Sequence, residues 1–224
     1  MKNQIWVVGV GGNYTLNNNK VISISPDIER LQLSTGGAAQ VYANMGYYFP
    51  VLMGTDYQRD PQGRIIVDRI TGYPSLDPTI RVLGNTVPKH RVGLDLEVMY
   101  KGFRLWALAE YRGGYYIYHN GGSTMDFSGS SIRTVAFGRD RFVIPNSSYE
   151  DPNKPGEYIA NTNIQVLDGG SGFWADGAGD YNMDIATNYI VKGDFWKIRE
   201  LSLSYDLPQA FLAKTKIIKG ATIS

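Results

Sequence analysis

Hydrophobic and polar residues alternate most clearly near the end of the chain, in the stretch GDFWKIRELSLSYDLP from Gly193 to Pro208. From Leu201 to Leu207 the odd positions are apolar or aromatic. The polar positions between them are Ser202, Ser204 and Asp206. A period of two residues is typical of a β-strand whose faces meet different surroundings. About 10 residues, with aromatics toward the ends and a proline that stops the hydrogen-bond ladder, are enough for a tilted strand to cross an outer membrane.

Two more regions alternate. From Ile5 to Leu16 (IWVVGVGGNYTL), bulky residues share one face, and glycine, asparagine and threonine share the other. The clearest hairpin joins Val92–Tyr100 to Phe103–Tyr111 through Lys101-Gly102, a two-residue connection with the glycine that such turns favour. The second arm alternates less cleanly, because Trp106 and Leu108 lie on its polar face. An apolar face suits lipid and a polar face suits a wet lumen, although the strands of a soluble sandwich also alternate.

The remaining segments lack sustained alternation. We predict that residues 21–90 form a long loop with small hairpins and a short strand from Arg64 to Val67. Five prolines argue against a central strand there: Pro50, Pro61, Pro74, Pro78 and Pro88. Residues 113–192 are predicted as a second long loop, and loops of that length are usually functional or disordered. Gln209 to Lys214 is predicted as a short helical turn.

Three stretches of the chain carry a family resemblance. They are GTDYQRDPQGRIIVDRITGYPSLDP (54–78), VLGNTVPKHRVGLDLEVMYKGFRLWALAEYRGG (82–114), and the final GDFWKIRELSLSYDLP with QAFLAKTKIIKG and ATIS after it. In this order they resemble the SusC/RagA-type TonB-dependent outer-membrane transporters. The resemblance implies an all-β fold: antiparallel strands of a partial transmembrane β-barrel with long extracellular loops, located in the cell outer membrane.

Members of that family import large nutrients, either glycans or oligopeptides. The resemblance implies a SusD-like surface lipoprotein as partner, and a TonB complex contacted through an N-terminal region outside this chain. It also implies that residues 1–224 are a fragment of the C-terminal barrel domain, without the plug domain, the signal peptide and the last strand. On this expectation the chain supplies roughly five strands of a barrel with about 22. Short turns of such barrels are periplasmic and long loops are extracellular, so Lys101-Gly102 is expected in the periplasm.

Composition agrees with a barrel. Hydrophobic residues make up 43% of the chain and charged residues 19%, with 26 glycines and 16 tyrosines. The chain contains no run of about 18 apolar residues, which a membrane-spanning helix needs. The net charge of +1 gives no reason to expect nucleic acid as a partner. Cysteine is absent, which excludes disulfides and thiolate metal sites.

No catalytic set assembles in the sequence, and we predict no enzyme, metal or cofactor. His90 and His119 lie in loop-like sequence without a nucleophile at motif spacing. Asp168, Asp176 and Asp180 lie among glycines but do not match the calcium-loop pattern. The stretch GVGGN invites comparison with a dinucleotide fingerprint, yet the YTLNNNK that follows does not predict the helix that such a fingerprint needs.

Aromatic residues of the second long loop are the candidate binding residues. We predict that Phe173, Trp174 and Tyr181 bind the glycan or peptide, since aromatic rings can stack on sugars or cover a substrate. The alternative is packing within the loops or anchoring at the membrane rim, which amphipathic aromatics commonly do.

Two other functions stay open at this point. A secreted β-sandwich that binds carbohydrate would use the same loop aromatics and would be soluble without detergent. A smaller complete porin or adhesin barrel would need no plug, and would close on its own strands.

Overall fold

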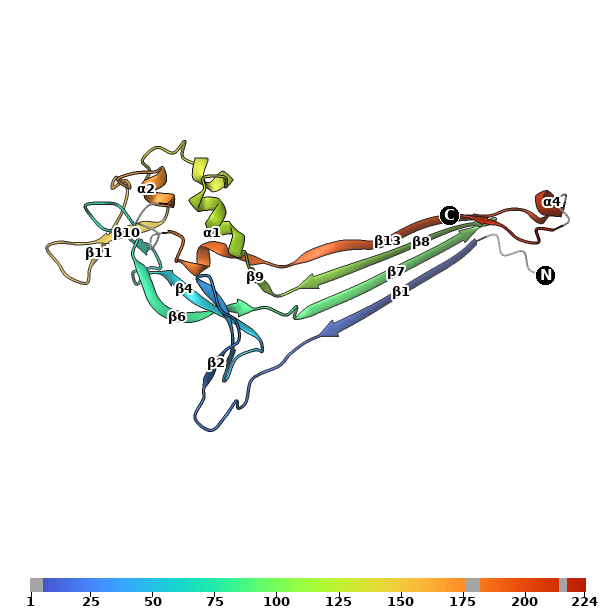
Figure 1. The fold of residues 1–224 in the computed structure, drawn as a ribbon, viewed down its shortest axis with the longest axis horizontal. Helices are drawn as coiled ribbons and strands as arrows, with labels where there is room; N and C mark the ends of the chain where they lie inside the picture. The colour runs from blue at the N-terminus through green and yellow to red at the C-terminus, as the bar shows by residue number, and fades with distance from the viewer. Residues whose placement is uncertain (1–5, 176–181, 214–216) are drawn as a thin grey trace. The chain divides into compact units, whose positions relative to one another are not determined.

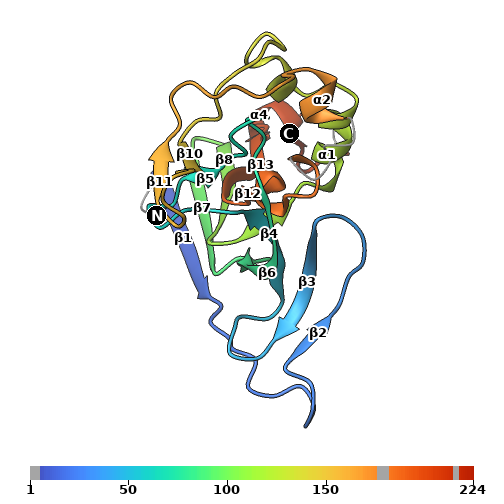
Figure 2. The ribbon, with the colours of Figure 1, turned by 90° about the vertical axis from the view of Figure 1, so that its left-hand side faces the viewer.

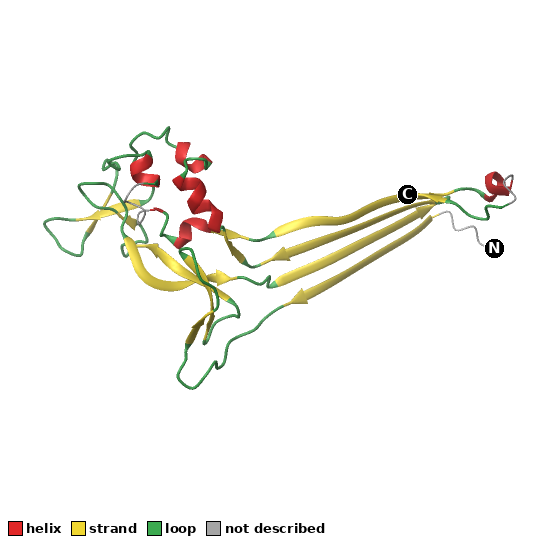
Figure 3. Ribbon diagram, in the orientation of Figure 1, coloured by secondary structure: helices red, strands yellow, loops and turns green. Residues whose placement is uncertain are grey.

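The chain folds into two compact units of sheet with few helices (Figures 1 and 3). The computed structural model describes residues 6–175, 182–213 and 217–224. Unit 1 is formed within residues 1–18, 88–115 and 193–224, and unit 2 within residues 19–87 and 116–192. Within the described ranges, each helix is too short or too polar to cross a membrane.

Unit 1 is an open antiparallel sheet with the strand order β1-β7-β8-β13-β14. Its strands are β1 (Trp6–Leu16), β7 (His90–Tyr100), β8 (Phe103–Gly113), β13 (Phe195–Asp206) and β14 (Thr222–Ile223). The four long strands run side by side in Figure 1. The strands predicted from alternation are therefore confirmed, whereas their closure into a barrel stays a prediction. A helical turn follows β13, α4 (Gln209–Leu212), as expected; Lys214 lies outside the described residues.

The hairpin between β7 and β8 turns at Lys101 and Gly102, both with positive φ (46° and 89°). Two successive positive φ values characterise the tight turn whose twist matches that of the two strands. Tyr100 and Phe103 pair directly beside it. This register places most apolar residues of both arms on one face, with Met99, Trp106 and Leu108 on the other.

A β-bulge in β13 explains a change of alternation in that strand. Ile198 pairs with Ala109 and Glu200 pairs with Leu108, so Arg199 is an extra residue in β13. Even positions before the bulge, such as Trp196, therefore share a face with the odd positions after it. The bulge keeps one face of β13 apolar along the whole strand.

Unit 2 contains a four-stranded sheet with the order β2-β3-β4-β6 (Figure 2). Its strands are β2 (Arg30–Gln32), β3 (Ala39–Asn44), β4 (Val51–Tyr57) and β6 (Leu76–Asn85). The prediction of a long loop without a central strand is wrong, because β4 pairs on both sides. Pro50 precedes β4 and Pro78 lies in the edge strand β6, where a missing N–H is tolerated. Alternation did not reveal β4 because its first residues are buried on both faces.

Short elements also fill the second predicted loop. The strand pairs are β9 (Tyr116–Tyr118) with β12 (Ile190–Lys192), and β10 (Ser147–Glu150) with β11 (Tyr158–Ala160) and β5 (Ile65–Ile66). The β10–β5 pair is parallel. The strand β5 lies in the first predicted loop and confirms the short strand predicted from Arg64 to Val67. The helices are α1 (Asn120–Phe127), η1 (Ile132–Val135), α2 (Ser171–Trp174) and η2 (Ala186–Tyr189). This segment is thus a packed region of short elements.

Candidate functional site

One face of the unit 1 sheet is apolar along its whole length. Residues that pair directly across antiparallel strands share a face, so the register defines rows of side chains. Three central rows are aliphatic with one glycine: Val8, Val98, Leu105 and Leu203; Val10, Leu96, Ala107 and Leu201; Gly12, Leu94, Ala109 and Ile198. Val10 is 77% exposed and Leu201 is 67% exposed. An apolar face of this size, left exposed, indicates that it meets lipid or another protein surface.

Aromatic residues border these aliphatic rows at both ends. The row beside the Lys101-Gly102 turn is Trp6, Tyr100, Phe103 and Tyr205. In it the ring centroids of Trp6 and Tyr100 are 4.1 Å apart, and those of Phe103 and Tyr205 are 4.3 Å apart. The row at the other end is Tyr14, Val92, Tyr111 and Trp196. Amphipathic rings in two belts with aliphatic residues between them are typical of a membrane-facing surface.

The opposite face of the same sheet is polar and carries ion pairs. The Glu110 carboxylate pairs with the guanidinium groups of Arg112 and Arg199. Nearer the turn, Arg104 Nε lies 3.5 Å from Glu97 Oε1. Charged side chains that pair along one face are suited to water rather than lipid, because an unpaired charge is costly in hydrocarbon.

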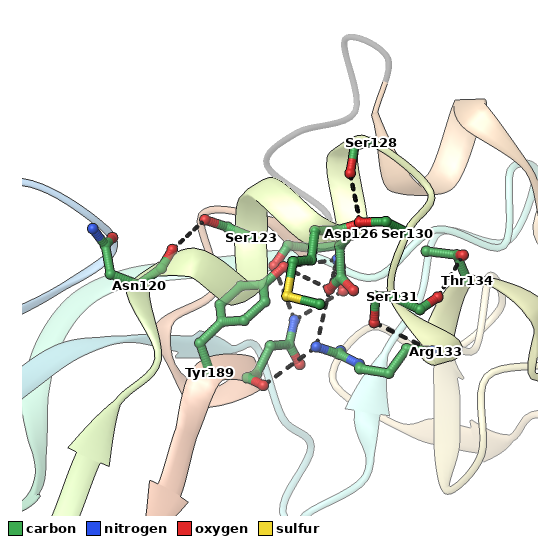
Figure 4. A network of polar contacts seen from close by, with 12 residues as sticks. Asn120, Ser123, Asp126, Ser128, Ser130, Ser131, Arg133, Thr134 and Tyr189 are labelled. Carbon is green, nitrogen blue, oxygen red and sulfur yellow. Dashed lines mark hydrogen bonds and ion pairs between the residues drawn. The ribbon is translucent and has the colours of Figure 1, made fainter.

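A network of polar contacts in unit 2 surrounds the carboxylate of Asp126, a residue of α1 (Figure 4). Asp126 is buried, with 1% of its surface exposed. It accepts hydrogen bonds from the Tyr189 hydroxyl at 2.9 Å and the Asn182 amide at 3.2 Å. Arg133 lies 3.0 Å away and supplies the opposite charge. Burial and the neighbouring Asp126 carboxylate raise the pKa of Tyr189, so its hydroxyl stays protonated and donates. The buried charge is thereby paired and hydrogen-bonded.

The same network extends to β4 through Asn188. The Asn188 side chain donates to the Asn182 carbonyl at 2.9 Å, and accepts from the Tyr57 hydroxyl at 2.9 Å. Next to it, the Thr187 hydroxyl donates to the Asp56 carboxylate at 2.9 Å. Residues far apart in sequence therefore fix η2 between α1 and the four-stranded sheet.

A cavity of about 220 Å³ lies beside this network. Phe127 and Trp174 give it apolar walls, and Arg139 and Ser171 add polar groups. The Arg133 guanidinium lies 5.5 Å from the Trp174 ring centroid, which fixes the ring by a cation–π contact. Such a cavity can bind a small group or side chain. Among the described residues, no three Asp, Glu or His side chains gather closely enough to hold a metal ion.

The three predicted binding residues have different positions. Phe173 is 5% exposed and packs against Tyr73 and Phe142, with centroids 6.2 and 5.2 Å away, as in the packing alternative. Trp174 is also largely buried, yet it lines the cavity. Tyr181 lies outside the described residues. Ligand binding at these positions stays a prediction.

The glycine-rich stretch around Asp168 has a structural role in the described part of the chain. The Asp168 carboxylate accepts hydrogen bonds from the backbone N–H groups of Gly170 and Gly172, each at 2.7 Å. These hydrogen bonds lower the pKa of Asp168 and close the loop before α2. Asp176 and Asp180, the other acids weighed for calcium, lie outside the described residues.

Sequence reasoning missed the network around Asp126. Its partners Asn182 and Tyr189 are 56 and 63 residues away in sequence. No motif or spacing connects these residues, and none of the three stands out by type. Only the folded chain brings them together.

The fold resembles that of a known protein. A solved structure described as "Structure of the RagAB peptide transporter" matches 99% of this chain with a TM-score of 0.62 and 15% sequence identity. This chain spans 23% of the length of that one. At such low identity the likeness shows a related fold alone. No protein-family model and no curated protein matches the sequence.

Proposed function

We propose that this chain forms part of the wall and the outer loops of a SusC/RagA-type transporter in the outer membrane, which imports large nutrients. The sequence resemblance described above supports this proposal, and so does the fold shared with a peptide transporter. The name of that matched protein favours an oligopeptide over a glycan as the substrate. A SusD-like surface lipoprotein and the TonB complex are the proposed partners.

The single observation that carries the proposal is the exposed apolar face of unit 1 with its two aromatic rows. Trp6 and Tyr14 are eight residues apart in β1. At about 3.3 Å per residue the rows are about 26 Å apart along the strand, or about 20 Å across a membrane at a tilt near 40°. This is close to the height of about 25 Å typical of the apolar band of outer-membrane barrels. A secreted sandwich is less consistent, because its apolar faces would be covered.

A pair of substitutions in adjacent positions tests this proposal. Leu201 lies in the middle aliphatic row and Ser202 lies on the polar face, paired with Trp106. We expect Leu201→Arg to destabilise the inserted protein by about 2–4 kcal/mol, whereas Ser202→Arg should change insertion little. The measurement is the amount of full-length protein that reaches the outer-membrane fraction and shows heat-dependent gel mobility. Equal insertion of both variants, or a parent protein that stays in the aqueous fraction, would contradict the proposal.

A further inference from the structure

Charge on the polar face of unit 1 is unevenly distributed along the strands. The two rows farthest from the Lys101-Gly102 turn are Thr15, Arg91, Arg112 and Phe195, then Asn13, Gly93, Glu110 and Lys197. With Arg199 from the bulge, this end has four cations and one carboxylate. Toward the turn the same face carries four acids and one arginine: Asp95, Glu97, Glu200, Asp206 and Arg104. The face is thus cationic at one end and acidic toward the other.

Two of the four cations are available to a ligand. The Glu110 carboxylate is shared by Arg112 and Arg199. Arg91 and Lys197 are both exposed, and in the described part of the chain neither forms an ion pair. Their charge is therefore balanced by solvent rather than by the protein.

A hollow of about 450 Å³ lies in this part of the face, with Arg91, Glu110 and Arg199 among its walls. Gly93 forms part of its floor and supplies no side chain. A Cβ at Gly93 would lie 2.9 Å from the Asn13 amide nitrogen, so a larger residue there would displace the Asn13 side chain, which also lines the hollow. The bulge adds Arg199 at the same place, and bulges commonly redirect a side chain in this way.

We propose that this cationic end, defined as Arg91, Lys197, Arg112 and Arg199 with the hollow that Arg91 and Arg199 line, binds the carboxylate groups of acidic oligopeptides during import. The inference rests on the proposed function and names its substrate class. Guanidinium and ammonium groups form strong charge-assisted hydrogen bonds with carboxylates. In the proposed topology this end lies toward the long extracellular loops, so an anionic peptide meets it first and is attracted over about 8–10 Å.

The test uses the purified full-length transporter in detergent and two peptides of equal length, one with several glutamates and one with glutamines in their place. We expect the wild type to bind the glutamate peptide more tightly, and high salt to remove the difference. The double variant Arg91→Gln, Lys197→Gln should weaken glutamate-peptide binding by about fivefold for each cation removed. Its affinity for the glutamine peptide should not change. Arg104→Gln, on the acidic part of the same face, is the matched control and should change neither affinity.

Equal affinity of the wild type for both peptides would overturn the inference, and so would an unchanged affinity in the double variant. If the double variant instead melts at lower temperature while peptide affinity is unchanged, the cations form ion pairs with an acidic segment of the same protein. The inference is then also wrong. Each of these results leaves the proposed function intact when the protein still inserts with heat-dependent mobility. Failure of the wild type to insert would instead remove the proposed function.

Discussion

At the residue scale, burial decides which charged groups matter for stability. The Asp126 carboxylate is buried, accepts hydrogen bonds from Asn182 and Tyr189, and forms an ion pair with Arg133. The pair of Lys154 and Glu157 is 3.2 Å long, but both side chains are more than 60% exposed. Exposed pairs contribute about 0–1 kcal/mol, because water screens them.

Replacing Asp126 should therefore open unit 2. Asp126→Ala removes the acceptor of the Tyr189 hydroxyl and the charge partner of Arg133, and we expect a loss of about 3 kcal/mol in the stability of unit 2. Limited proteolysis of the full-length protein between residues 116 and 192 should become more than tenfold faster. Lys154→Ala is the control and should leave the cleavage rate unchanged. Equal rates for the two variants would show that Asp126 does not hold this unit together.

Unit 2 should also lose stability in acid. Burial alone would raise the pKa of Asp60, but hydrogen bonds from Ser148 and Arg64, and the charge of Arg64, outweigh burial and hold it below the usual 3.8. A folded pKa below the unfolded one means that stability is present above about pH 4, and falls as the unfolded chain takes up protons below it. Hydrogen exchange around residues 58–67, corrected for intrinsic rates, should show this loss. Asp60→Asn should flatten the pH dependence, and an unchanged slope would exclude Asp60 as its source.

The packing of individual aromatic residues could not be predicted from the sequence. Phe173 and Trp174 are adjacent and of similar type, and both pack in the core, but Trp174 also lines the cavity. Phe173 contacts Tyr73 and Phe142, whereas the Trp174 ring lies beside Arg133, and all three partners are distant in sequence. Spacing and residue type carry no information about such contacts.

At the scale of elements, alternation predicts a strand only when its two faces meet different surroundings. The strands β1, β7, β8 and β13 have one apolar and one polar face, and their positions follow from the sequence. In contrast, β4 is buried on both faces and shows no alternation where it begins. The change of phase within β13 is visible in the sequence, but only pairing with β8 identifies Arg199 as the extra residue.

The bulge gives a test of the register. Deleting Arg199 should leave the faces of β13 unchanged, since Ile198 would then directly precede Glu200 in regular alternation. Deleting Ser202 should transfer one part of the strand to the wrong face, because a one-residue slip inverts every side chain. We expect normal outer-membrane insertion for the first deletion and little or none for the second. The reverse result would place the bulge elsewhere.

At the scale of the whole molecule, the two units differ in how far the sequence reveals them. Unit 1 follows from local alternation and one tight turn, so its strands could be predicted with their faces. Unit 2 depends on contacts such as those of Asp126 with Tyr189 and of Tyr57 with Asn188, which join distant segments. Its sheet and cavity could not be predicted for that reason.

The surroundings of the two faces of unit 1 can be measured directly. These 224 residues contain no cysteine, so single cysteines from Phe195 to Asp206 can carry a spin label in the full-length protein in lipid bilayers, once any cysteine outside them has been replaced. We predict that labels at Trp196, Ile198, Leu201 and Leu203 are reached by oxygen dissolved in the lipid, and that labels at Lys197, Ser202 and Ser204 are reached by a water-soluble relaxant. The alternation should break once, at Arg199. Labels reached equally by the water-soluble relaxant on both faces would contradict a membrane-spanning sheet.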